Sequence, residues 1–123
     1  MRIVVLGAAG GVGATAARAL GRSRDVTELV LADRDGSALA ALTDELTADP
    51  QHAGAQVTAV EFDARDIQVV IRTITGADCV LNCVGPFYDF GPPLLSAAIT
   101  AGTPYIDVCD DLSPTRTMLA MSA

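Results

Sequence analysis

Four glycines near the start of the chain have the spacing of a loop that binds phosphate groups. Gly7, Gly10 and Gly13 recur at every third position, and Gly11 leaves one more position without a side chain. Glycine permits a sharp turn and a close approach of backbone to an anion, and the N–H groups that open a following helix point at that anion. The pattern predicts recognition of a pyrophosphate, the bridge of a dinucleotide.

An acidic residue stands where such a loop needs one. Apolar residues at 3–6 predict a buried strand before the glycines, and residues 27–32 predict a second strand that Asp33 follows. Asp33 comes about 20 residues after Gly13, the distance expected of a carboxylate that accepts hydrogen bonds from the adenosine ribose. Without this context the glycines would indicate only a flexible turn, so Asp33 favours dinucleotide binding.

Composition limits the function classes. The chain has 123 residues, enough for one domain, and a net charge of −7. An acidic surface of this kind disfavours nucleic acid and anionic membranes as partners, and no apolar run is long enough for a membrane helix. All eight basic residues are arginine, which excludes a Walker phosphate loop and Schiff-base chemistry. Cys79, Cys83 and Cys109 lack metal-ligand spacing; we expect reduced thiols, a cytoplasmic location and no metal.

Strand and helix patterns alternate along the whole chain. We expect strands at about 3–6, 27–32, 56–62, 77–83 and 104–108, and helices at about 12–21, 35–50, 67–76 and 91–102, with another helix starting near Ser113. This order predicts a doubly wound α/β fold with about five parallel strands in three αβα layers. Val12, Ala16 and Leu20 are expected on one face of the first helix, and Pro92 and Pro93 in the first turn of the fourth.

The segment 77–111 carries a more specific signal than the glycines. Its stretches NCVGPF at 82–87 and YIDVCDD at 105–111, with ADRD at 32–35 and FDARD at 62–66, resemble the NAD(P)-binding domain of the saccharopine dehydrogenase-like family. The similarity extends over nearly the whole chain and implies a Rossmann-like fold. Trans-acting enoyl reductases carry a related Gly-Pro-aromatic segment, so they remain the alternative reaction class.

The resemblance implies roles for particular residues. Gly7, Ala9, Gly10, Gly11 and Val12 would surround the pyrophosphate, Asp33 would bind the adenosine ribose, Asp63 and Ala64 would lie by the adenine, and Cys83, Val84, Gly85, Pro86 and Phe87 would pass beneath the nicotinamide ribose. Asp63 has a helix cap as its alternative role, and Phe87 has packing under the loop. Asn82 is expected to tie the fourth strand to its neighbour through its amide.

Cofactor and reaction follow from these roles. Asp33 favours NAD because a carboxylate repels a 2′-phosphate, while Arg34 could stack on adenine or hold that phosphate, which leaves NADP as the alternative. The resemblance implies an oxidoreductase that transfers a hydride to or from a C–N bond of an amino-acid or polyamine-type substrate. A non-catalytic NAD-binding regulatory module is the competing hypothesis.

The chain has no residues left over for a substrate domain, so we expect residues 1–123 to be one coenzyme domain cut from a longer enzyme and inactive alone. The substrate would bind through the missing part, and a homodimer remains open. Asp107, Asp110 and Asp111 crowd the end of the fifth strand. They would position an amino-acid substrate, remain solvated loop acids, or cap a helix.

Overall fold

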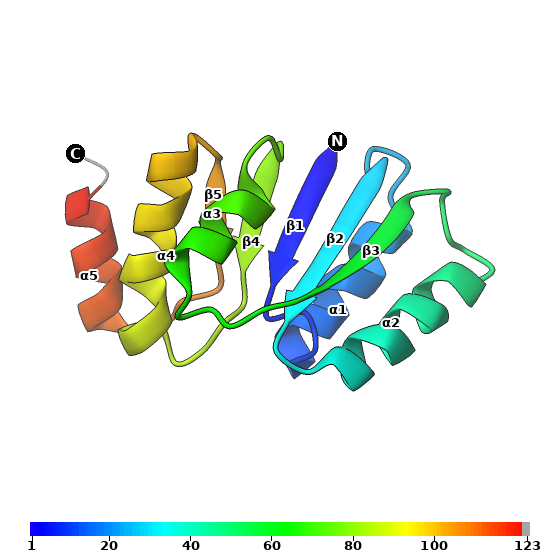
Figure 1. Cartoon of the computed structure of the whole chain (residues 1–123), viewed down its shortest axis with the longest axis horizontal. Helices are drawn as coiled ribbons and strands as arrows, with labels where there is room; N and C mark the ends of the chain where they lie inside the picture. The colour runs from blue at the N-terminus through cyan, green and yellow to red at the C-terminus, as the bar shows by residue number, and fades with distance from the viewer. Residues whose placement is uncertain (122–123) are drawn as a thin grey trace.

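One parallel sheet organises the molecule. The computed structural model describes residues 1–121. Its five strands are β1 (Arg2–Leu6), β2 (Glu28–Asp33), β3 (Gln56–Glu61), β4 (Cys79–Asn82) and β5 (Tyr105–Asp107). They lie in the order β3-β2-β1-β4-β5 with every neighbouring pair parallel (Figure 1). This is the doubly wound arrangement that the alternating pattern predicts, so the predicted fold class is confirmed.

Helices cover the two faces of the sheet and complete the three layers. They are α1 (Gly11–Gly21), α2 (Gly36–Ala48), α3 (Ile67–Ile74), α4 (Phe87–Ala101) and α5 (Leu112–Met121). One core cluster joins a face of the sheet to α1 and α2 through residues such as Val5, Leu31 and Leu42. The other joins the opposite face to α3 and α4 through residues such as Val4, Val70 and Leu94. In Figure 1, α5 lies beyond α4 at the outer end of the molecule.

Local signals fix where several helices begin and end. Asp35 caps α2, since its Oδ1 accepts a hydrogen bond of 3.0 Å from the Ala38 N–H, and Asp66 caps α3 through the Val69 N–H at 3.4 Å. Gly102, at a φ of 69°, ends α4 in the left-handed conformation that favours glycine. The start of α2 at Asp35 and the end of α4 at Gly102 agree with the sequence pattern, whereas Asp66 caps α3 in place of Asp63.

The fourth helix begins earlier than predicted. α4 starts at Phe87 instead of Gly91, so Pro92 and Pro93 lie inside it. A proline there removes the N–H that would bond to the carbonyl four residues before, at Tyr88 and Asp89. Both of those residues are exposed, so solvent is available near the carbonyls that lose their helical partner.

The buried face of α1 also differs from the prediction. Gly13, Ala14, Ala17 and Gly21 are buried, whereas Val12 is 57% exposed. The smallest side chains face the sheet because α1 approaches the glycine loop closely: a Cβ on Gly13 would lie 2.1 Å from the Gly7 carbonyl oxygen. Of the three residues predicted on one face, Val12 is therefore exposed, Ala16 is partly buried, and Leu20 packs against the core from its edge.

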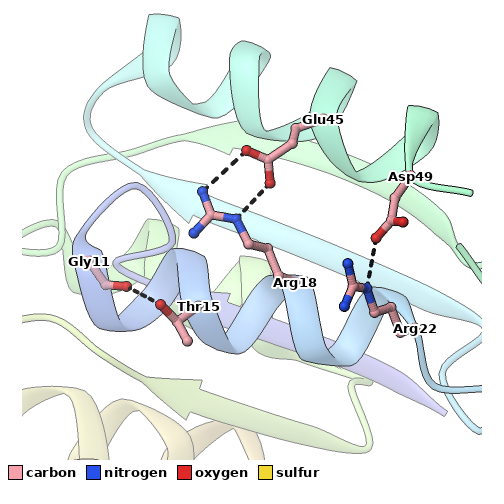
Figure 2. Close-up of polar contacts among 6 residues, drawn as sticks. All are labelled: Gly11, Thr15, Arg18, Arg22, Glu45 and Asp49. Carbon is pink, nitrogen blue, oxygen red and sulfur yellow. Dashed lines mark hydrogen bonds and ion pairs between the residues drawn. The ribbon is translucent and has the colours of Figure 1, made fainter. Parts of the chain in front are cut away.

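Ion pairs join α1 to α2 on the outer side of the molecule. Arg18 donates from Nε to Glu45 at 2.6 Å and from a terminal nitrogen at 3.2 Å, and Arg22 Nε lies 2.8 Å from Asp49 Oδ2 (Figure 2). These two pairs join the C-terminal end of α1 to the C-terminal end of α2. Among the described residues, no helix combines the length and apolar character needed to cross a membrane.

Candidate functional site

A cleft lies at the point where the winding of the sheet reverses. β1 is flanked by β2 on one side and β4 on the other, and the carboxyl ends of all three open on the same edge. Ligands of doubly wound sheets bind in this crevice. The cleft has a volume of about 380 Å³ and is lined by Gly7, Gly10, Asp33, Arg34, Phe62, Asp63, Ala64, Arg65, Cys83, Val84, Gly85, Pro86 and Phe90.

The glycine loop turns sharply between β1 and α1. Gly7 has a φ of 79°, and its N–H donates to the Ala32 carbonyl at 2.8 Å. A Cβ on Gly7 would lie 2.8 Å from the Cys83 carbonyl oxygen, and one on Gly13 would overlap Gly7, so both positions require glycine. In contrast, a Cβ on Gly11 would meet no atom within 4 Å, so the outer side of the loop is open.

The two helices that begin at the cleft have no side-chain cap. Gly10 precedes α1 and Pro86 precedes α4, and neither has a side chain that accepts a hydrogen bond from the first-turn N–H groups. The helices capped by aspartate, α2 and α3, show the other arrangement. Because the first N–H groups of a helix need acceptors and carry partial positive charge, the start of α1 is suited to an anionic group. The backbone at this position fits a pyrophosphate.

Asp33 is fixed in place by the backbone around it. Its Oδ2 accepts a hydrogen bond of 3.0 Å from the Ala9 N–H, and its Oδ1 accepts one of 3.1 Å from the Asp35 N–H. A carboxylate oxygen has two acceptor sites, so each oxygen keeps capacity for a further donor. The side chain therefore joins the glycine loop to the end of β2 and faces the cleft with a preset orientation.

The segment after β3, beside Asp33, carries an exposed ion pair at the wall of the cleft. Arg65 binds Asp63 through two contacts, from Nε to Oδ1 at 3.1 Å and from a terminal nitrogen to Oδ2 at 2.8 Å. Hydrogen bonds from the Arg65 side chain and backbone, with a smaller effect of Arg34, lower the pKa of Asp63 to about 2. Asp63 is thus a carboxylate at all physiological pH values, and the cap of α3 is Asp66 instead.

A buried polar network holds the loop after β4. The Asn82 side chain is fully buried; its Oδ1 accepts from the Val84 N–H at 2.9 Å, and its Nδ2 donates to the Phe90 carbonyl at 3.2 Å and to the Tyr105 hydroxyl at 3.0 Å. The Tyr105 hydroxyl in turn donates to Asp107 at 2.8 Å. The predicted link from β4 to its neighbour through the Asn82 amide is present.

Two groups in and beside this network favour their neutral, protonated forms. Burial raises the pKa of Tyr105 well above its usual range, and the hydrogen bond to Asp107 adds to this. Burial, with a further effect of Asp107, raises the pKa of the Cys83 thiol. Asp107 also accepts from the Cys109 N–H at 3.1 Å, so this acid serves the internal network. Cys83 therefore contributes an uncharged thiol to the cleft.

Most of the residues singled out in the sequence meet in the cleft. Ten line it directly: Gly7, Gly10, Asp33, Arg34, Asp63, Ala64, Cys83, Val84, Gly85 and Pro86. Ala9, Gly11, Val12 and Gly13 belong to the adjoining loop and first turn of α1. Phe87 does not line the cleft; it is buried beside Gly91, near Met118 of α5.

Three lining residues were not predicted. Phe62, Arg65 and Phe90 contribute an aromatic ring, a guanidinium and a second ring to the cleft wall. Phe62 and Arg65 lie in the FDARD stretch, which already marked their neighbours. Phe90 follows Phe87 by one helical turn only if α4 begins at Phe87, so the wrong helix start hid it.

Within residues 1–121, no three His, Cys, Asp or Glu side chains are grouped to hold a metal.

The strand order and the glycine-lined cleft at its switch point define a Rossmann-like α/β domain. Residues 3–121 match the model of the saccharopine dehydrogenase NADP binding domain, and the chain belongs to this family. It is thus an NAD(P)-binding domain of the saccharopine dehydrogenase-like oxidoreductases, as the resemblance in the sequence implies.

A sequence relative agrees with this assignment, and solved structures agree with the fold. A probable mitochondrial saccharopine dehydrogenase-like oxidoreductase of Arabidopsis thaliana is 31% identical over 112 residues, which are 86% of this chain and 24% of that protein. Apo saccharopine dehydrogenase (L-Glu forming) of Saccharomyces cerevisiae superposes with a TM-score of 0.70 at 19% identity, covering 95% of this chain and 23% of that one.

A dTDP-glucose 4,6-dehydratase of Streptomyces venezuelae, solved with NAD, gives a TM-score of 0.63 at 26% identity, covering 84% of this chain and 37% of that one. The chain thus spans about a quarter of the length of the saccharopine dehydrogenase-like relatives.

Proposed function

We propose that the chain binds NAD with its pyrophosphate at the start of α1. The observation that carries this is the uncapped first turn of α1 at the wall of the cleft, next to a loop whose outer side is open at Gly11. The backbone N–H groups of Gly10, Gly11 and Val12 would bind the phosphate oxygens, while Gly7 and Gly13 allow the loop and helix to approach closely.

Asp33 would hold the adenosine ribose. The Ala9 and Asp35 N–H groups fix its carboxylate toward the cleft, and its free acceptor sites suit the two ribose hydroxyls. A carboxylate at this place favours NAD over NADP, whose 2′-phosphate it repels. Arg34, which lines the same part of the cleft, would stack on the adenine.

The two ends of the cofactor would lie on opposite walls. Asp63 and Ala64 suit the adenine, since a carboxylate accepts from its exocyclic amine and a backbone N–H donates to a ring nitrogen. Cys83, Val84, Gly85 and Pro86 would support the nicotinamide ribose, with the loop held by Asn82. Phe90, which lines this wall, replaces Phe87 in our proposal as its aromatic residue.

The protein that contains this domain would be an oxidoreductase acting on a C–N bond of an amino-acid or polyamine-type substrate. The family membership and the Arabidopsis relative support this class. The nicotinamide supplies the hydride chemistry when bound, and the residues described here bind and orient it. Substrate and general acid or base would come from the part of the protein beyond this chain.

Cofactor binding is tested by titrating the chain with NADH and following the nicotinamide fluorescence. We expect saturable enhancement in the wild type and a loss of about 1.5–3 kcal/mol of binding free energy in Asp33→Ser, the scale of a hydrogen bond to a charged group. Asp44→Ser is the matched control, because it removes the same charge from an exposed position of α2 outside the cleft. Unchanged affinity in Asp33→Ser would contradict the ribose role.

A further inference from the structure

A second depression adjoins the cleft at Arg34. It is open and shallow and is lined by Arg34, Asp35, Gly36, Ser37, Ala40 and Glu61. Arg34 lines both hollows, and Asp33, the residue proposed to bind the adenosine ribose, immediately precedes it. NADP differs from NAD by a phosphate on that ribose, so the groups beside Asp33 are those that such a phosphate would meet.

Glu61 places a second carboxylate beside Asp33. The two residues are register partners at the ends of β3 and β2, and partners on neighbouring parallel strands point to the same face of the sheet about 5 Å apart. The Glu61 carboxylate extends over the start of α2, because a Cβ on Gly36 would lie 2.6 Å from its Oε2 and 3.1 Å from its Cδ. The absence of a side chain at Gly36 is what gives this carboxylate its space.

Acidic side chains of the chain itself therefore lie at the start of α2. Asp35 caps the helix through the Ala38 N–H, and Glu61 lies above Gly36, the first residue of the helix. In the described part of the chain, Arg34 is the one basic residue that lines the depression. A phosphate entering there would meet Arg34 and Ser37 as partners but also carboxylates of Asp33, Asp35 and Glu61. Like charges a few ångströms apart repel each other strongly enough to set selectivity.

We infer that Glu61 is a specificity-determining residue that acts with Asp33 to exclude the 2′-phosphate of NADP. This inference rests on the proposed NAD site and adds a second acid, on a different strand, to the one that the glycine pattern locates. Without the Glu61 charge, Arg34 and Ser37 present a cation and a hydroxyl donor to a phosphate. Selectivity at this position is thus a balance between one guanidinium and the acids around it.

The test compares NADH and NADPH binding by fluorescence titration in wild type, Glu61→Gln and Asp44→Asn. Glu61→Gln keeps the size of the side chain and removes its charge, while Asp44→Asn removes one charge from an exposed position of α2 that lines neither hollow. We expect Glu61→Gln to bind NADPH more tightly by about tenfold and NADH within about twofold of wild type, and Asp44→Asn to leave both unchanged. The gain should shrink in 1 M salt, where charges are screened over about 3 Å.

Each other result has a definite meaning. An NADPH to NADH ratio in Glu61→Gln equal to that of wild type would overturn the role of Glu61 while leaving NAD binding intact. An equal gain in Asp44→Asn would overturn it as well, because net charge alone would then explain the effect. If the wild type binds neither nucleotide, the proposed function fails first, and circular dichroism of each variant shows that the fold is present.

Discussion

Substituting Gly13 by alanine should separate the two tasks of the glycine loop. A Cβ at this position would lie 2.1 Å from the Gly7 carbonyl oxygen, 2.8 Å from its carbonyl carbon and 2.9 Å from the Ala8 Cα. All three atoms are backbone, so no flexible side chain can move aside. Restoring ordinary contact requires α1 to shift from the loop by more than about 1 Å, away from the core it packs against.

The expected cost follows from two opposing effects. Overfilling a packed interior costs about 1–3 kcal/mol, and a contact with rigid backbone belongs at the upper end of that range. Alanine in place of glycine inside a helix gains up to about 1 kcal/mol. Gly13→Ala should therefore lose about 2 kcal/mol of unfolding free energy, which for a domain of this size lowers the melting temperature by about 8 °C.

Gly11→Ala is the matched control on the same helix. Its Cβ would meet nothing within 4 Å, so the variant should be as stable as wild type or slightly more stable, yet bind NADH weakly because the methyl group faces the proposed pyrophosphate. Urea unfolding followed by circular dichroism measures the stability of both variants, since the chain has no tryptophan to report on folding. Equal urea midpoints for Gly13→Ala and Gly11→Ala would refute the close approach of α1 to the loop.

Two further predictions concern the network behind the loop after β4. Asn82→Ala leaves the Val84 N–H and the Phe90 carbonyl without their buried partner and should lower the unfolding free energy by about 2–4 kcal/mol; a loss below about 0.5 kcal/mol in urea unfolding would show that the network is not formed. Because burial raises the pKa of Tyr105, the folded state binds the phenol proton more tightly than the unfolded state. That stabilisation is complete below the ordinary tyrosine pKa of about 10 and is lost as pH rises above it. Tyr105→Phe should flatten this alkaline decline, whereas Tyr88→Phe, at a side chain 63% exposed, should leave it in place.

The sheet, and the part of the cleft formed by the glycine loop and Asp33, could be predicted because their signals are local in sequence. Buried strands of a parallel sheet are continuous apolar runs, and Asp35 and Gly102 mark helix ends by their own chemistry. The glycine loop and Asp33 were found in the same way, since loop, strand and acid occur within a fixed span of chain.

The buried face of α1 and the position of Glu61 depend on contacts between distant segments. Val12 had the periodicity of a buried residue, but the approach of α1 to Gly7 places the smallest residues of the helix against the sheet instead. Glu61 had no local pattern at all; its importance arises from register with Asp33 and from the missing side chain at Gly36. Spacing along the chain carries no information about either contact.

Gly7 is the place where these distant segments meet. Its N–H bonds to the end of β2, its carbonyl oxygen abuts Gly13 of α1, and its Cα faces the backbone of Cys83 after β4. A change in the path of one of these segments must therefore be accommodated by the other two. The first, second and fourth strand ends cannot diverge independently, and sequence variation in such a domain should be correlated across this junction.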